Sequence, residues 1–199
     1  MRELILKMSM SLDGFVSDME GRNAWMFGGD EEAKAWSVEN VANASLHIMG
    51  SRSFEAMAPF WPVSTTLFAP PMNQIPKAVF SRRGAAILKA AELPADATLQ
   101  PGGESWAQSH VASGDLAGEI TRLKSETGKP ILAHGGYSFA QSLVASGLVD
   151  QFVFAIHPIA LGQGHSPFSR LEAPLPLTLV SSRTFPGGAM AQVYRPTGR

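Results

Sequence analysis

Short apolar runs alternate along the chain with segments whose apolar residues follow helical spacing. The runs predicted as buried strands cover residues 4–10, 46–49, 78–80, 131–133 and 152–156. The segments predicted as helices begin near Asp30, at Ser51, near Leu116 and near Phe139. Short strands that are bounded by turn residues and separated by helices are typical of βαβ crossovers. The pattern therefore predicts an α/β fold with a mostly parallel sheet that helices cover on both faces.

Three parts of the chain depart from this alternation. Residues 58–76 contain five prolines, which exclude a long regular element and predict a loop over the surface. Residues 84–104 are rich in alanine, proline and glycine and receive no assignment. The runs 177–185 and 189–195 flank a Pro-Gly-Gly turn, so we expect an antiparallel β-hairpin at the C-terminal end. No repeat or linker divides the chain, and we expect a single domain over residues 1–199.

Composition and charge narrow the range of partners. The formal net charge of −1 gives no long-range attraction to nucleic acid or to an anionic membrane surface. No apolar stretch suits a secretory signal or a membrane span, and we therefore expect a cytoplasmic protein. Cysteine is absent and the 5 histidines show no metal-ligand spacing, which excludes thiolate chemistry and argues against a metal site.

Three segments share one design, in which a short strand is followed by small or polar residues and then by a turn or a helix start. They are Gly50-Ser51-Arg52-Ser53, Ser81-Arg82-Arg83 and Gly135-Gly136-Tyr137-Ser138. Open α/β sheets bind ligands at the carboxyl ends of their strands. Glycine lets the backbone approach a phosphate, and arginine offers a forked donor to phosphate oxygens. Together the segments favour a phosphorylated dinucleotide, although each alone is explained by glycines in turns and solvated arginines.

Candidate substrate and catalytic residues follow the first strand and the last strand before the hairpin. Asp13 could orient a substrate or help to deliver the proton that accompanies hydride transfer, or it could form an Asx turn at Gly14. Phe15 and Trp25 could wall a flat substrate, although large apolar residues more often belong to the core. Gly162, in a Gly-Gln-Gly sequence, permits either close substrate approach or a plain loop.

These residues carry a resemblance to a known family. The segments that match it are Met10–Phe15, Gly50–Glu55, Ser81-Arg82, Leu123-Lys124, Gly135-Gly136, Gly147–Asp150 and Pro158–Gly164. In order and content they resemble the dihydrofolate-reductase-like family, and within it the branch that contains the reductase domain of bacterial riboflavin biosynthesis. The match runs from the first strand to the last hairpin, and residues 123–168 are its most specific part.

The resemblance implies an NADPH-dependent reductase on a three-layer α/β/α sandwich. By family roles, Gly50–Ser53 would bind the cofactor pyrophosphate and Ser81–Arg83 the adenosine 2′-phosphate, while Gly135–Phe139 would lie beside the nicotinamide and pyrophosphate. Relatives act on a pteridine or an aminopyrimidine and commonly form homodimers, to which the apolar segment Leu175–Val180 could contribute an edge strand. The alternatives are a non-catalytic NADPH-binding protein and, with less support, a hydrolase or metalloprotein on the same sheet.

Overall fold

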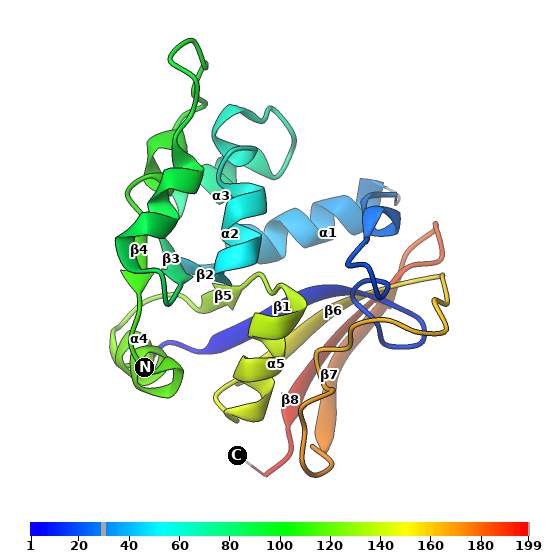
Figure 1. Cartoon of the computed structure of the whole chain (residues 1–199). Coiled ribbons are helices and arrows are strands. Elements are labelled where there is room, and N and C mark those ends of the chain that lie inside the picture. The colour runs from blue at the N-terminus through cyan, green and yellow to red at the C-terminus, as the bar shows by residue number, and fades with distance from the viewer. Residues whose placement is uncertain (29–30, 199) are drawn as a thin grey trace. The chain divides into compact units, whose positions relative to one another are not determined.

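The computed structural model describes residues 1–28 and 31–198 (Figure 1). Its internal contacts divide the chain into two units. Unit 1 comprises residues 1–3 and 38–136, and unit 2 comprises residues 4–37 and the chain from Tyr137 onward. Helix α1 (Glu31–Ala42) begins in unit 2 and ends in unit 1. Asp30, which we expected to open this helix, lies outside the described residues. The single-domain expectation stays a prediction.

Unit 1 contains a parallel sheet in the order β4-β3-β2-β5. Its strands are β2 (Leu46–Gly50), β3 (Lys77–Phe80), β4 (His110–Ala112) and β5 (Ile131–Ala133). Gly50 pairs with Phe80, and Ile48 pairs with Ala133, so the carboxyl ends of β2, β3 and β5 lie at one edge of the sheet. The sequence correctly predicted three of these strands and missed β4, which has three residues.

The connections of unit 1 are short helices. They are the α-helices α2 (Ser51–Met57), α3 (Ala69–Gln74) and α4 (Leu116–Ser125), and the 3₁₀ helices η2 (Trp61–Val63), η3 (Gly84–Ala91) and η4 (Gly103–Trp106). The expectation that residues 58–76 form a surface loop was wrong. Prolines are tolerated in the first turn of a helix, where the missing N–H is not needed, and α3 begins with Ala-Pro-Pro. Met72 and Asn73 of this helix are buried.

A polar cluster fastens these connections to the start of β3, and we call Asn73, Lys77, Ser105 and Trp106 the Lys77 cluster. Lys77 is only 2% exposed, and its Nζ donates to the carbonyl of Asn73, at 2.9 Å, and to Ser105 Oγ. The Asn73 side chain donates to the carbonyl of Trp61 and accepts from the indole N–H of Trp106. These paired side chains hold η2, α3 and η4 on the sheet.

Unit 2 contains a mixed sheet in the order β1-β6-β8-β7. Strand β1 (Leu4–Ser11) pairs in parallel with β6 (Gln151–His157), and β8 (Met190–Pro196) pairs antiparallel with both β6 and β7 (Leu177–Thr184). The predicted C-terminal hairpin is thereby confirmed. Its outer strand, β7, is exposed along nearly its whole length, including Leu179 and Val180.

The two faces of β1 differ. Leu4, Leu6, Met8 and Met10 are buried, whereas Ile5, Lys7 and Ser9 on the other face are only partly buried. Helix α5 (Tyr137–Ala145) is drawn in front of the strands of this unit (Figure 1). Trp36 of α1 packs against the cluster formed by Phe185, Ala189 and Ala191. None of the helices in residues 1–28 and 31–198 is long and apolar enough to cross a membrane.

Candidate functional site

Each of the three predicted cofactor segments follows the carboxyl end of a parallel strand, and the three strands are neighbours in the sheet of unit 1. The segments after β2 and β5 are in contact. Ser53 lies in α2, directly after β2, and its Oγ accepts a hydrogen bond of 2.7 Å from the backbone N–H of Gly136, after β5. A Cβ at position 136 would lie 3.0 Å from that oxygen, so the site favours glycine. Gly135 has a φ of +80°, a backbone conformation that residues with a side chain rarely adopt. The sequence thus places two small-residue turns together at the carboxyl edge of the sheet.

The two arginines after β3 have different environments. Arg83 Nη1 lies 2.7 Å from Glu55 Oε1 of α2, and the hydrogen bond from Arg83 lowers the pKa of Glu55. Arg82 is exposed and makes no hydrogen bond or ion pair with the residues that the structure describes. Ser81 is buried, and its Oγ accepts from the N–H of Arg83 at 3.2 Å. Arg82 is therefore the arginine at this strand end whose guanidinium remains available to an anion.

The other predicted cofactor residues, Tyr137, Ser138 and Phe139, form the first turn of α5 in unit 2. The Tyr137 ring stacks on the His165 imidazole, with centroids 3.8 Å apart and an angle of 4° between the planes. His165 is also anchored by its backbone, whose N–H donates to the carbonyl of Ser17. The stack fixes the orientation of the Tyr137 ring.

Asp13 is held in the turn after β1 by hydrogen bonds within unit 2. Its carboxylate accepts from Ser11 Oγ at 2.6 Å and from the N–H groups of Leu161, at 3.0 Å, and Gly162, at 2.7 Å. The Ser11 hydrogen bond and the backbone donors lower the pKa of Asp13 to about 2. At neutral pH this side chain is an ionised acceptor that connects the turn to the loop at Gly162, and it has no proton to donate.

The predicted substrate residues also lie in unit 2. Phe15 closes the same turn, because Ser11 Oγ accepts from its N–H at 3.0 Å. Gly162 has a φ of +72°, and a Cβ there would meet nothing within 4 Å. Trp25, in η1 (Ala24–Phe27), packs edge-to-face against His157, with centroids 5.3 Å apart. The structure thus brings Asp13 to Gly162, and Trp25 to a histidine that the sequence did not single out.

Two titratable residues of this region escaped the sequence prediction of the site. Lys7 donates to Ser37 Oγ at 2.6 Å, lies 5.9 Å from the Trp36 ring, and has its pKa lowered to about 8 by burial. Burial and, to a smaller extent, the charge of Lys7 lower the pKa of His157. The available signal was the interruption of an apolar strand by Lys7, which marks a side chain on the less buried face.

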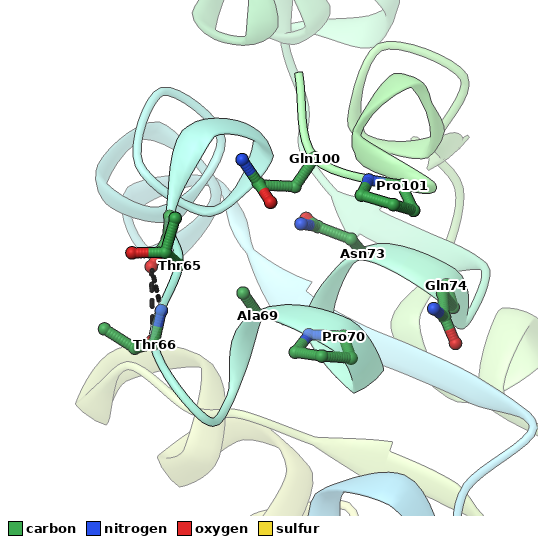
Figure 2. Close-up of a pocket in the computed structure, with 9 residues that line it drawn as sticks. Thr65, Thr66, Ala69, Pro70, Asn73, Gln74, Gln100 and Pro101 are labelled. Atoms are coloured by element: carbon green, nitrogen blue, oxygen red, sulfur yellow. Dashed lines mark hydrogen bonds between the residues drawn. The ribbon is translucent and has the colours of Figure 1, made fainter. Parts of the chain in front are cut away.

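Unit 1 also has a cavity of about 160 Å³ that is separate from the predicted residues (Figure 2). Neutral side chains line it, including Asn73 from α3 and Gln100 from the loop before η4. It contains none of the predicted cofactor or substrate residues and no charged side chain. Within residues 1–28 and 31–198, no three His, Asp or Glu side chains come close enough together to hold a metal ion.

Comparisons with known proteins identify the family and the fold of the chain. The family model of the RibD C-terminal domain matches residues 2–191. The chain is 26% identical to the uncharacterized protein YyaP of Bacillus subtilis (strain 168), over 99% of this chain and 96% of that protein. A proposed riboflavin biosynthesis protein from Shewanella sp. PV-4 superimposes with a TM-score of 0.69 at 21% identity, covering 98% of this chain and 99% of that one.

Dihydrofolate reductase from Enterococcus faecalis has the same fold. It superimposes with a TM-score of 0.61 at 12% identity, covering 98% of this chain and 96% of that one. Together with the parallel strands and the antiparallel C-terminal hairpin, this likeness confirms the predicted α/β sandwich. The chain therefore belongs to the RibD C-terminal domain family and has the dihydrofolate-reductase-like fold.

Proposed function

We propose that this protein is an NADPH-dependent reductase that transfers hydride to a small pteridine- or aminopyrimidine-like heterocycle. The observation that carries the proposal is the edge of unit 1, where the hydrogen bond from Gly136 to Ser53 joins two strand ends beside a third, which bears Arg82. The likeness to reductases supports it, since the matching Enterococcus faecalis enzyme is complexed with NADP(H).

The residues at this edge suit a phosphorylated dinucleotide. Gly135 and Gly136 have no side chain to block the backbone, which allows a pyrophosphate to approach closely. Gly50–Ser53 form the neighbouring turn and the first residues of α2. Arg82 is exposed and pairs with none of the residues that the structure describes, so its forked donors suit the 2′-phosphate. Arg83 pairs with Glu55, and we assign it the lesser role of holding the loop.

When bound, NADPH supplies the hydride, and the chain must orient the acceptor. Phe15, Trp25 and Gly162 are the residues that we propose to contact the substrate. Asp13 is a positioning residue, because its carboxylate holds the backbone of Leu161 and Gly162 in place. We also propose that the protein acts in the cytoplasm as a homodimer in which the exposed strand β7 contributes to the interface. A monomer mass by light scattering at micromolar concentration would contradict the dimer.

The test is a titration with NADPH followed by assays of NADPH oxidation with pterins, aminopyrimidines and flavins. We expect binding and substrate-dependent oxidation with at least one pterin or aminopyrimidine. Binding without turnover for every compound would favour the non-catalytic alternative. Absence of NADPH binding would overturn the proposal.

The role of Asp13 is tested by Asp13→Asn. The amide keeps the shape of the side chain but removes its negative charge, so the N–H groups of Leu161 and Gly162 lose a charged acceptor and their hydrogen bonds become weaker. We expect normal folding and NADPH affinity, with a fall in reduction rate of about a hundredfold, the size typical of lost positioning. An unchanged rate would show that the loop at Gly162 does not depend on this carboxylate.

A further inference from the structure

One face of the sheet in unit 2 carries polar side chains, and one of them, His157, has a buried nitrogen without a hydrogen-bond partner among the residues that the structure describes. In the parallel register of β1 and β6, Lys7 pairs with Val153, Ser9 with Ala155, and Ser11 with His157. Paired residues of parallel strands share a face, so this face carries a lysine, a histidine and small side chains between them. The opposite face, with Leu6, Met8 and Phe154, is apolar and buried.

Trp25 and His157 form a ring pair on this side of the unit. Their planes are inclined by 73°. Neither Trp25 Nε1 nor His157 Nε2 has a hydrogen-bond partner among the residues that the structure describes, although both atoms are shielded from solvent. Buried polar atoms are almost always paired in folded proteins, so these two atoms are candidates for hydrogen bonds to a water molecule or to a ligand.

The charges around the pair define what that partner must offer. Trp25 Nε1–H is a donor only. His157 is neutral at neutral pH, because burial and the neighbouring Lys7 charge lower its pKa, and its Nε2 can then accept a hydrogen bond when the proton lies on Nδ1. A donor on one ring and an acceptor on the ring that packs against it, with centroids 5.3 Å apart, complement a cyclic amide, in which a ring carbonyl adjoins a ring N–H.

We propose that Trp25 and His157 are the specificity-determining pair of this protein and select heterocycles with a cyclic amide edge. The indole N–H donates to the ring carbonyl, and the imidazole Nε2 accepts from the ring N–H. This assignment rests on the proposed reductase function and identifies the residues that read the substrate. Heterocycles with an amino group and an unprotonated ring nitrogen at the same edge have donor and acceptor reversed, so they are rejected.

The experiment compares two matched ligand pairs on the NADPH-saturated protein by calorimetry. Pterin and isocytosine carry the cyclic amide, and diaminopteridine and diaminopyrimidine replace it with the reversed edge. We expect each amide compound to bind about tenfold or more tightly than its diamino partner, since unmatched polar groups are strongly rejected. Comparable affinities within both pairs, or no binding by either amide compound, would overturn the assignment.

The variants Trp25→Phe and His157→Phe keep an aromatic ring at each position and remove the polar atoms. Each variant should bring the ratio of affinities between an amide compound and its diamino partner closer to one. His157→Gln retains a donor and an acceptor and should keep this ratio closer to that of the unmodified protein. His110→Phe, at an exposed histidine in unit 1, is the matched control and should leave the ratio unchanged. An undiminished ratio in both Phe variants would contradict the proposal.

NADPH affinity is measured in parallel by calorimetry with the same variants. It should not change in Trp25→Phe or His157→Phe, and thermal melting should show both to be folded. If NADPH binds but the protein binds the amide and diamino compounds equally well, the assignment of this pair fails while the reductase proposal stands. If NADPH does not bind, the reductase proposal itself fails.

Discussion

Each unit contains a buried or partly buried lysine close to an indole ring and polar side chains, and the two groups differ in how completely their own polar atoms are paired. Near the Lys77 cluster, Trp61 Nε1 and His47 Nδ1 also lack a partner among the residues that the structure describes. Around Lys77 in unit 1, the lysine, Asn73, Ser105 and the Trp106 indole all form hydrogen bonds with one another or with the backbone. Around Lys7 in unit 2, the lysine bonds to Ser37, whereas Trp25 Nε1 and His157 Nε2 have no partner within the described chain.

The difference separates structural from functional polar groups. A buried polar group that is fully paired stabilises the fold, and removing one member leaves the others unsatisfied. A polar group left unpaired within the chain lowers stability unless water or a ligand satisfies it, and at Trp25 and His157 we assign that role to the substrate. Mutation of polar residues in the Lys77 cluster should therefore lower the stability of the protein. Mutation of the unpaired polar residues near Lys7 should instead change which ligands the protein binds.

Asn73→Ala should produce the largest loss of stability. The side chain is fully buried, and its removal strips partners from the carbonyl of Trp61 and the indole N–H of Trp106. We expect the free energy of unfolding to fall by about 3 kcal/mol in urea denaturation. The matched control, Asn43→Ala at an exposed position, should change it by no more than about 0.5 kcal/mol. Similar losses in the free energy of unfolding for Asn73→Ala and Asn43→Ala would show that the hydrogen bonds of the Lys77 cluster do not contribute specially to stability.

The pH dependence of stability should distinguish the two lysines. Burial lowers the pKa of Lys77 from 10.5 to about 7, and that of Lys7 to about 8. Between these values and 10.5 the unfolded chain binds more protons than the folded chain, so the free energy of unfolding rises with pH. Each lysine contributes at most about 1.4 kcal/mol per pH unit.

Matched methionine variants test this assignment by urea denaturation across the pH range. Lys77→Met should flatten the rise in stability from about pH 7 upward, and Lys7→Met only from about pH 8 upward. A rise between pH 7 and 8 that survives in Lys77→Met would show that another group is responsible.

His157→Phe should have the smallest effect on stability, and of opposite sign to that of Asn73→Ala. Phenylalanine retains the ring packed against Trp25 and removes a nitrogen that lacks a partner. We expect the free energy of unfolding to stay constant or to rise by up to about 1 kcal/mol. A loss of more than about 2 kcal/mol would indicate that the imidazole makes a structural hydrogen bond, and would weaken the comparison.

Hydrophobic pattern predicted the elements that have strong periodicity or clear turn signals. Strands β1, β2, β3, β5 and β6 and the terminal hairpin were all recognised from apolar runs bounded by glycine, proline or polar residues. Strand β4 was missed because three residues at the edge of a sheet show no alternation. The sequence does not predict helix α3 because prolines usually end a helix, although the first turn of a helix accepts Pro70 and Pro71.

The candidate site was predictable where it depends on strand ends, and not where it depends on pairing across the fold. Gly50–Ser53, Ser81–Arg83 and Gly135-Gly136 follow strands that proved to be neighbours in the sheet of unit 1. Local sequence patterns do not predict contacts between residues that are far apart in the chain. The ion pair of Arg83 with Glu55 and the hydrogen bonds from Leu161 and Gly162 to Asp13 are such contacts. The meeting of Trp25 and His157 is of the same kind.

The affinity for NADPH relative to NADH tests the central claim most directly. At the strand end where we place the 2′-phosphate, Arg82 is exposed and pairs with none of the residues that the structure describes, whereas Arg83 is paired with Glu55. By calorimetry, the unmodified protein should prefer NADPH, and Arg82→Ala should weaken NADPH binding by about 1.5–3 kcal/mol with little change for NADH. Arg83→Ala should have a smaller effect. Equal affinity of the unmodified protein for the two cofactors would contradict the account.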